Sequence, residues 1–218
     1  MTQFRTVFLT GSFLIALCGG AVQAQPAGKP MMTLQMPALP DPARVTLKPA
    51  TTALLVLDYV EDICARQPKC KSQMLPAVTP FMAAARKAGV VVAYGTRAQN
   101  MTKWLPEVAP AAGDIKIINT AQDRFYNTDL DKELKAKGVT TIIMVGWKVS
   151  GSVAYTSVGA TVRGYTVVIP MDTTAAATDY ETTIGFYNVL NSGNANLANE
   201  ALKPHAVTLT RTDLITFR

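Results

Sequence analysis

Runs of apolar residues recur along the chain with few polar interruptions. Continuous runs of this kind, as opposed to apolar–polar alternation, are typical of parallel strands that are buried on both faces of a sheet. We therefore predict four long strands and two shorter ones. The long strands are at residues 52–57, 89–94, 141–146 and 165–169, and the shorter ones at 115–118 and 206–209.

The segments between these runs predict helices. Before three of the strands, basic residues are followed by glycine, at 86–89, 135–138 and 163–164. Cations oppose the negative end of a helix dipole, and glycine supplies the left-handed residue that ends the helix. Thr128 is a predicted N-cap for the second helix, residues 178–190 predict another, and the chain is expected to end in a turn. The alternation predicts a three-layer αβα, Rossmann-like fold around a parallel sheet of about six strands.

The first 24 residues have a different character. Arg5 is their only charged residue, an apolar stretch follows it, and the segment ends in Val22-Gln23-Ala24. This pattern is typical of a secretory signal peptide, so a periplasmic or secreted location is expected. The alternative is a membrane anchor, but polar residues interrupt the stretch and it is shorter than the roughly 20 residues that a span requires.

Proline content and charge define the rest of the chain. Residues 25–48 hold five of the 13 prolines and show no helical period, so they are expected to form an extended linker. Residues 49–218 have the size of one domain. The net charge of +6 comes from scattered basic residues, which disfavours a nucleic-acid partner. No membrane contact is expected once the signal is removed.

Cysteine and histidine are scarce. Cys18 would leave with the signal, and Cys64 and Cys70 would remain with five residues between them. In an oxidising compartment this pair predicts a disulfide, the alternative being two buried thiols. His205 is the only histidine, so a His/Cys metal site has almost nothing to build from, and we expect neither metal nor cofactor.

Ligands of open parallel sheets bind beyond the carboxyl ends of the strands. The polar residues that follow the predicted strands are Asp58, Tyr59, Thr96, Arg97, Asn100, Asn119, the segment 147–152 and Asp172. Asp58 is the strongest candidate, because burying a carboxylate at the end of an apolar strand is unfavourable unless it is ion-paired or takes part in binding or catalysis. The alternative is an aspartate that caps a loop. Ser150 and Ser152 begin a helix whose N–H groups can hold an anion, or they are only N-caps.

Four segments in order resemble one family. Residues 54–62 resemble the opening strand of the isochorismatase-like cysteine hydrolases, which ends in the catalytic aspartate. Residues 125–130 resemble the family's F-x-x-T-x-L segment, 146–164 its nucleophile region, and Asp172 the aspartate after the next strand. Order and spacing agree over about residues 50–180, so the chain is identified as a member of this superfamily.

The resemblance implies a triad of aspartate, lysine and cysteine, of which only the aspartate carries over, to Asp58. Ser152 stands at the cysteine position and Asn119 at the lysine position, and Arg124 is a cation that can reach the site. The family's non-proline cis peptide would fall between Lys148 and Val149. The stretch after the second strand lacks the acid and histidines of the family's metal-binding amidases, so no metal is implied.

We therefore expect an exported hydrolase of a small molecule with an amide, ester or vinyl ether. Asp58 would act as acid or base, with Ser152 and Arg124 as its catalytic partners. The residues expected to bind substrate are Tyr59, Arg97, Asn119, Trp147, Val149 and Gly151. The alternative is a non-catalytic small-molecule-binding protein on the same fold. The resemblance also implies that the chain can form a homo-oligomer.

Export generates the first testable prediction. Expressed in a Gram-negative host, the chain should be recovered from the periplasm and begin at Gln25, because signal peptidase cuts after the small residue Ala24. N-terminal sequencing of the periplasmic fraction measures this, and a variant without residues 2–24 should stay in the cytoplasm. Recovery in the membrane with the N-terminus intact would indicate the anchor instead.

Overall fold

The computed structural model of the chain describes residues 33, 35–98 and 103–218. The predicted signal peptide and Asn100 lie outside these residues. The compact unit is Ala38–Arg218. The linker predicted for residues 25–48 therefore overlaps the folded unit, since β1 (Val45–Leu47) has two buried side chains and pairs in parallel with β9 (Ile215–Phe217). A strand of three residues is too short to show a period, which is why the sequence predicted a linker at one end and a turn at the other.

The main sheet contains the six predicted strands. Their spatial order is β4-β3-β2-β5-β6-β8, and every pairing is parallel. The strands are β2 (Thr52–Leu57), β3 (Val91–Arg97), β4 (Ile115–Asn119), β5 (Thr141–Trp147), β6 (Thr166–Pro170) and β8 (Val207–Thr210). A short β7 (Thr174–Ala175) pairs with the end of β5. The α/β fold class predicted from the apolar runs is thus confirmed.

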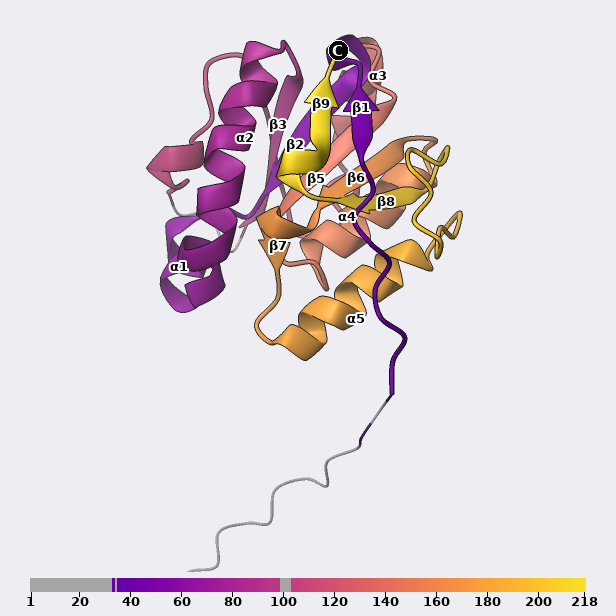
Figure 1. Cartoon of the computed structure of the whole chain (residues 1–218). Coiled ribbons are helices and arrows are strands. Elements are labelled where there is room, and N and C mark those ends of the chain that lie inside the picture. Colours follow the sequence, from indigo (N-terminus) through magenta and orange to yellow (C-terminus); the bar gives the residue numbers. More distant parts are fainter. Residues whose placement is uncertain (1–32, 34, 99–102) are drawn as a thin grey trace, which may run out of the picture. The chain divides into compact units, whose positions relative to one another are not determined.

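Within the described part of the chain, five α-helices connect the strands (Figure 1). They are α1 (Glu61–Arg66), α2 (Leu75–Lys87), α3 (Leu130–Ala136), α4 (Ser152–Thr161) and α5 (Asp179–Leu190). The three glycines predicted to end helices all have positive φ, which is 84° at Gly89, 72° at Gly138 and 89° at Gly164. Thr178 caps α5 by accepting from the Glu181 N–H at 3.0 Å. The predicted cap Thr128 is one residue early, because Asp129 holds the N-cap position of α3.

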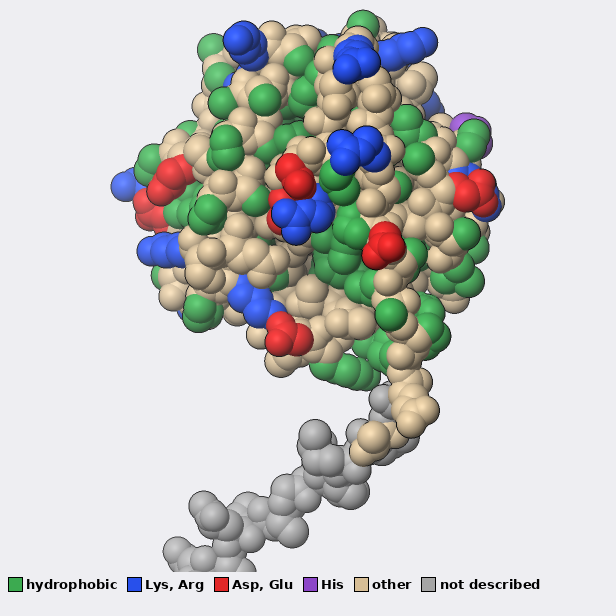
Figure 2. Space-filling view, in the orientation of Figure 1, with side chains coloured by type: hydrophobic (Ala, Val, Ile, Leu, Met, Phe, Trp, Pro, Cys, Tyr) green, Lys and Arg blue, Asp and Glu red, His purple; other side chains and the backbone are tan. Residues whose placement is uncertain are grey.

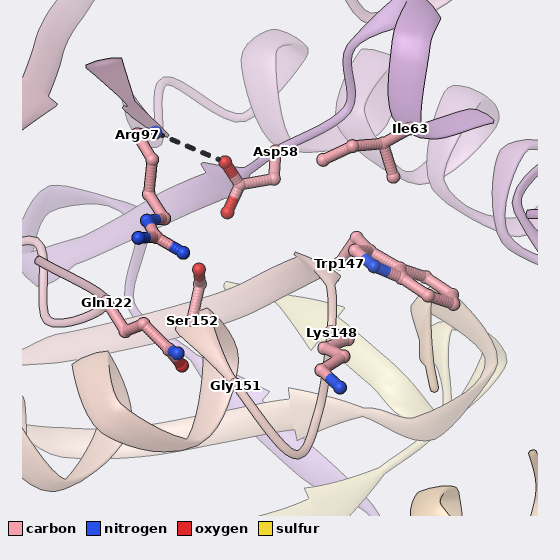
Figure 3. A pocket seen from close by; sticks show the side chains of 8 residues that line it. All are labelled: Asp58, Ile63, Arg97, Gln122, Trp147, Lys148, Gly151 and Ser152. Carbon is pink, nitrogen blue, oxygen red and sulfur yellow. Dashed lines mark hydrogen bonds between the residues drawn. The ribbon is translucent and has the colours of Figure 1, made fainter. Parts of the chain in front are cut away.

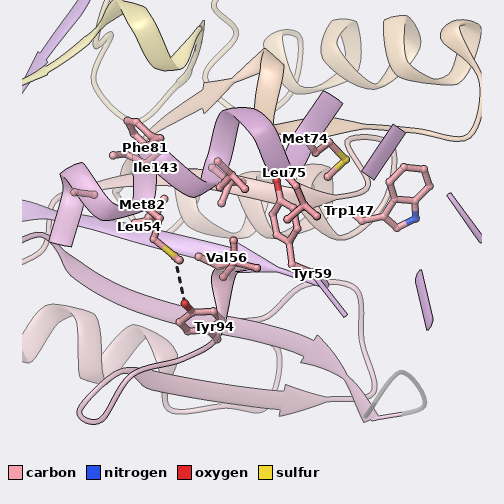
Figure 4. Packing of buried hydrophobic residues seen from close by; sticks show 14 of the residues in the cluster. Leu54, Val56, Tyr59, Met74, Leu75, Phe81, Met82, Tyr94, Ile143 and Trp147 are labelled. Atoms are coloured by element: carbon pink, nitrogen blue, oxygen red, sulfur yellow. Dashed lines mark hydrogen bonds between the residues drawn. The ribbon is translucent and has the colours of Figure 1, made fainter. Parts of the chain in front are cut away.

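Side chains of the sheet alternate between two cores. In β2, Leu54 and Val56 belong to the first core, where they pack with α2, β1 and β9. Leu55 and Leu57 belong to the second core, where they pack with α3, α4 and α5. Figure 4 shows the first core, where the Tyr94 hydroxyl contacts the sulfur of Met82 at 3.4 Å. Because both faces of the sheet are covered, its central strands β2 and β5 are buried almost along their whole length, which is the pattern that predicted them.

Two buried asparagines bind the main chain of β8. The Asn199 amide accepts from the Leu209 N–H at 2.7 Å and donates to the Leu209 carbonyl at 2.8 Å. Asn196 donates to the Val207 carbonyl at 2.9 Å. The N-terminal segment adds to this contact, since the Ala43 N–H also donates to the Leu209 carbonyl at 2.9 Å.

Charged groups on the visible face lie singly or in small groups among apolar side chains (Figure 2). Within residues 33, 35–98 and 103–218, no helix combines the length and the apolar character needed to cross a bilayer.

The layered core generates a stability prediction. Leu55 is fully buried in the second core, so Leu55→Ala should lower the free energy of unfolding by about 2–5 kcal/mol through lost contacts and a cavity. Leu197 is 53 % exposed, so Leu197→Ala should change the free energy of unfolding by less than about 0.5 kcal/mol. Urea unfolding of both variants measures the difference, and equal effects would contradict the assigned core.

Candidate functional site

A small cavity lies where β2, β3 and β5 end and α4 begins. Its volume is about 220 Å³. Figure 3 shows the side chains that line it, which are Asp58, Ile63, Arg97, Gln122, Trp147, Lys148, Gly151 and Ser152. Five of these were predicted from the sequence as site residues, namely Asp58, Arg97, Trp147, Gly151 and Ser152.

Asp58 follows directly on the last residue of β2 and is only 2 % exposed. Its backbone has φ 54°, and its N–H donates to the Gly95 carbonyl at 3.0 Å. One carboxylate oxygen accepts from the Thr96 hydroxyl at 3.0 Å and, at 3.4 Å, from the Arg97 N–H. The other accepts from Arg124 at 2.7 Å. The carboxylate therefore lines the cavity while β3 and Arg124 hold it in place.

Arg124 joins the two candidate catalytic side chains. Its side chain has no exposed surface, and its Nη2 donates to Asp58 Oδ2 at 2.7 Å and to Ser152 Oγ at 2.9 Å. Its Nη1 donates to Asn119 Oδ1 at 2.9 Å and to the Ala121 carbonyl at 2.5 Å. Burial lowers the pKa of the Arg124 guanidinium, and the charge of Asp58 opposes that shift. One guanidinium thus contacts the carboxylate and the hydroxyl at once.

The space for Arg124 is made by a glycine. A Cβ at Gly95 of β3 would lie 2.8 Å from Arg124 Cγ and 2.9 Å from Leu57 Cδ2. Asn119, at the end of β4, fixes the guanidinium from the other side, because its amide also donates to the Asp123 carbonyl at 2.8 Å. Asn119 therefore positions Arg124 and lies outside the cavity lining, contrary to the substrate contact predicted for it.

Ser152 is the first residue of α4, and the turn before it is tightly constrained. Gly146 has φ 131°, and a Cβ there would lie 2.0 Å from the Leu57 carbonyl oxygen. The cis peptide bond is Trp147–Lys148, one bond earlier than predicted, directly after the last residue of β5. Gly151 is the N-cap and makes no side-chain cap. The Ser152 hydroxyl contacts Arg124, so the alternative in which it only caps the helix does not hold.

Three lining residues were missed by the sequence analysis. Lys148 pairs with Glu181 of α5, which also accepts from the Ser150 hydroxyl at 2.7 Å. Lys148 and Ser150 together lower the pKa of the Glu181 carboxyl. Lys148 lies in the turn that the sequence had singled out, whereas Gln122 and Ile63 lie in segments without a recognisable motif.

The side chains of two predicted substrate contacts lie in the cores and not in the cavity lining. Tyr59 is fully buried in the first core, where its hydroxyl donates to the Thr173 carbonyl at 2.7 Å. Val149 is fully buried in the second core. Asp172 lies outside the lining and accepts from the Thr212 hydroxyl at 2.6 Å.

Cys64 and Cys70 form the predicted disulfide, with their Cα atoms 5.2 Å apart. Cys64 lies on α1 next to Ile63, so the disulfide closes the short loop that directly follows this lining residue. Among the residues that the structure describes, no three or more His, Cys, Asp or Glu side chains form a group that could hold a metal ion.

The buried ion pair generates a double-variant prediction. Arg124→Met should lower the free energy of unfolding by about 3–5 kcal/mol, because it leaves the Asp58 charge buried without a partner. Asp58→Asn combined with Arg124→Met should recover part of this loss. Lys135→Met, which breaks an exposed pair with Asp131, is the control and should cost less than about 1 kcal/mol in urea unfolding. Strictly additive effects of the two buried variants would contradict the coupling.

Similar proteins have related sequences and the same fold. Residues 52–200 match the isochorismatase domain family. The uncharacterized isochorismatase family protein YecD of Escherichia coli O157:H7 is 30% identical over 156 residues, which cover 60% of this chain and 83% of YecD.

Solved structures share the fold at lower identity. N-carbamoylsarcosine amidase from Thermoplasma acidophilum superposes with a TM-score of 0.62 at 21% identity, covering 75% of this chain and 97% of its own. A cysteine hydrolase from Pseudomonas syringae pv. phaseolicola has a TM-score of 0.62 at 20% identity, covering 83% and 95%. Since the matched domain spans most of the compact unit, the chain belongs to the isochorismatase-like hydrolase family.

Proposed function

We propose that the protein is an exported hydrolase that cleaves an amide, ester or vinyl ether of a small molecule in the cavity at Asp58. One observation carries the proposal: Arg124 Nη2 lies within hydrogen-bond distance of both Asp58 and Ser152, and these two side chains line the same cavity. Two proteins of the same fold, named an amidase and a cysteine hydrolase, support the reaction class.

In this proposal Ser152 takes the place of the family cysteine and Arg124 that of the lysine. A serine hydroxyl is a weak nucleophile until a base removes its proton. Arg124 donates to Ser152 Oγ, which directs the serine proton away from the guanidinium. Because an arginine does not release its proton near neutral pH, Arg124 orients the other two groups and balances charge but does not carry a proton. The proton therefore moves to or from Asp58.

For an amide or ester, Ser152 Oγ attacks the carbonyl carbon while its proton passes to Asp58. The positive end of the α4 dipole, which begins at Ser152, would stabilise the developing oxyanion. The leaving group takes the proton back from Asp58, and water then releases the acyl group from Ser152. For a vinyl ether, protonated Asp58 gives its proton to the carbon–carbon double bond, and water adds to the resulting oxocarbenium carbon and returns a proton to Asp58. The hemiketal then separates into a ketone and an alcohol, so Ser152 is not required as a nucleophile.

A second candidate is a binding protein without catalysis. Asp58 is ion-paired with a cation that keeps its charge, and an aspartate is a poor base for a hydroxyl. Among the residues that the structure describes, no thiol side chain lines the cavity. Both features favour ligand retention over rapid acyl transfer, so a turnover assay separates the two candidates.

The test is turnover by the exported protein on a panel of nitrophenyl esters, small amides and vinyl ethers. Asp58→Asn should lower kcat/KM by about 100-fold or more, because it removes the proton carrier. Ser152→Ala should abolish ester and amide turnover but spare vinyl ether turnover. Asp131→Asn, on α3 and outside the cavity lining, is the matched control and should leave all rates unchanged.

Turnover that survives Asp58→Asn would overturn the role of Asp58. Saturable binding without turnover across the whole panel would favour the binding protein.

A further inference from the structure

We propose that the substrate is an ester or amide of a short apolar carboxylic acid, whose acyl chain binds against Ile63 and Trp147. This inference rests on the proposed function and names its substrate class. The lining of the cavity, its size and the contacts that hold its apolar wall support it.

The cavity has one apolar wall. Ile63 of α1 and Trp147 at the end of β5 form it, and among the described lining residues they are the only two with apolar side chains. Both also belong to the first core, so the wall is the part of that core that reaches the cavity. An apolar group of a ligand gains from leaving water only where it contacts such a surface. The acyl chain therefore has one place to bind.

The opposite side of the cavity is polar. In Figure 3 Ile63 and Trp147 lie on one side of Asp58, whereas Gln122 lies on the other. Gln122 is exposed to solvent. In the acyl transfer proposed above, the leaving alcohol or amine takes up a proton and departs to water, so the polar side suits it. The acyl group, which stays on Ser152 until water releases it, is then directed toward the apolar wall.

The size of the cavity limits the acyl chain. An apolar cavity of about 150 Å³ holds one benzene ring, which corresponds to roughly 25 Å³ for each carbon atom. At that density the volume of about 220 Å³ holds roughly nine non-hydrogen atoms. The scissile group and the first atoms of the leaving group take about half of them, which leaves room for about three or four carbon atoms of the chain.

Contacts outside the cavity hold both residues of the wall. Trp147 pairs with Ala175 of β7. Ile63 directly precedes Cys64, whose disulfide with Cys70 ties α1 to the segment that leads into α2. A packed wall that is held in this way resists the insertion of further methylene groups. A longer chain therefore cannot bring its carbonyl group to the serine hydroxyl without a steric clash.

The first experiment measures ester hydrolysis by the exported protein against chain length, with 4-nitrophenyl acetate, butanoate, hexanoate and octanoate. From acetate to butanoate kcat/KM should rise about tenfold, because two more methylene groups are buried. From butanoate to octanoate it should fall at least about tenfold, because the chain exceeds the pocket. A kcat/KM that is independent of length, or that rises up to octanoate, would overturn the acyl pocket and leave the hydrolase standing.

Variants of the wall should move the preferred length in opposite directions. Ile63→Ala enlarges the pocket and should shift the optimum to hexanoate, whereas Ile63→Phe fills it and should shift the optimum to acetate. Trp147→Leu enlarges it from the other residue of the wall and should also favour hexanoate. Val78→Ala, in the first core but outside the lining, is the matched control and should keep butanoate as the optimum. A folding defect alone does not produce opposite shifts, and an optimum that stays at butanoate in the variants of the wall would contradict the assignment.

A binding measurement separates the failures of the two proposals. Calorimetry of the exported protein compares N-methylbutanamide with N-methylheptanamide, and the shorter amide should bind at least about fivefold more tightly because the longer one clashes with the wall. Ile63→Phe should remove this preference. That result without turnover of any ester would support the pocket while the hydrolase fails. Equal or tighter binding of the longer amide, or binding of neither in the millimolar range, would overturn the pocket.

Discussion

The ion pair between Asp58 and Arg124 can persist inside the protein only because every charge in it has a partner. A buried guanidinium without hydrogen bonds would cost several kcal/mol, roughly as much as the fold has to spare. Arg124 therefore requires Asp58 at the end of β2, Asn119 at the end of β4 and the carbonyl of Ala121. It also requires the missing side chain at Gly95 of β3. Three neighbouring strands are thus fitted to a single side chain.

The same pair connects stability to chemistry. Arg124 Nη2 contacts Ser152 as well as Asp58, so the guanidinium that neutralises the buried carboxylate also orients the hydroxyl. In the proposed reaction Asp58 gains a proton and loses its charge while Arg124 keeps its own. The site then carries additional positive charge at the moment when an oxyanion forms, which is where such charge is useful. An arginine suits this task because its charge does not change with the reaction.

The fold was predictable because buried parallel strands consist of continuous runs of apolar residues, as in residues 52–57 and 141–146. Asp58 and Ser152 were predictable because strand ends and helix starts meet at one edge of such a sheet. The direction of side chains beyond a strand end was not: Tyr59 and Val149 lie in the cores. Arg124 could be named but not placed, since the segment between β4 and α3 has no period and its path is set by hydrogen bonds to Thr156 of α4.

The amides of Asn196 and Asn199 have a consequence for how copies of the chain behave toward one another. The last strand of an open sheet normally offers a row of main-chain donors and acceptors, on which a strand of another molecule can align and begin an aggregate. At β8 these groups are taken by side chains and by Ala43 of the same chain. Intermolecular strand addition would first have to displace amides that are buried and tethered. The loop that carries Asn196 and Asn199 supplies no side chain of the cavity lining. It instead protects this edge of the sheet from pairing with a strand of another molecule.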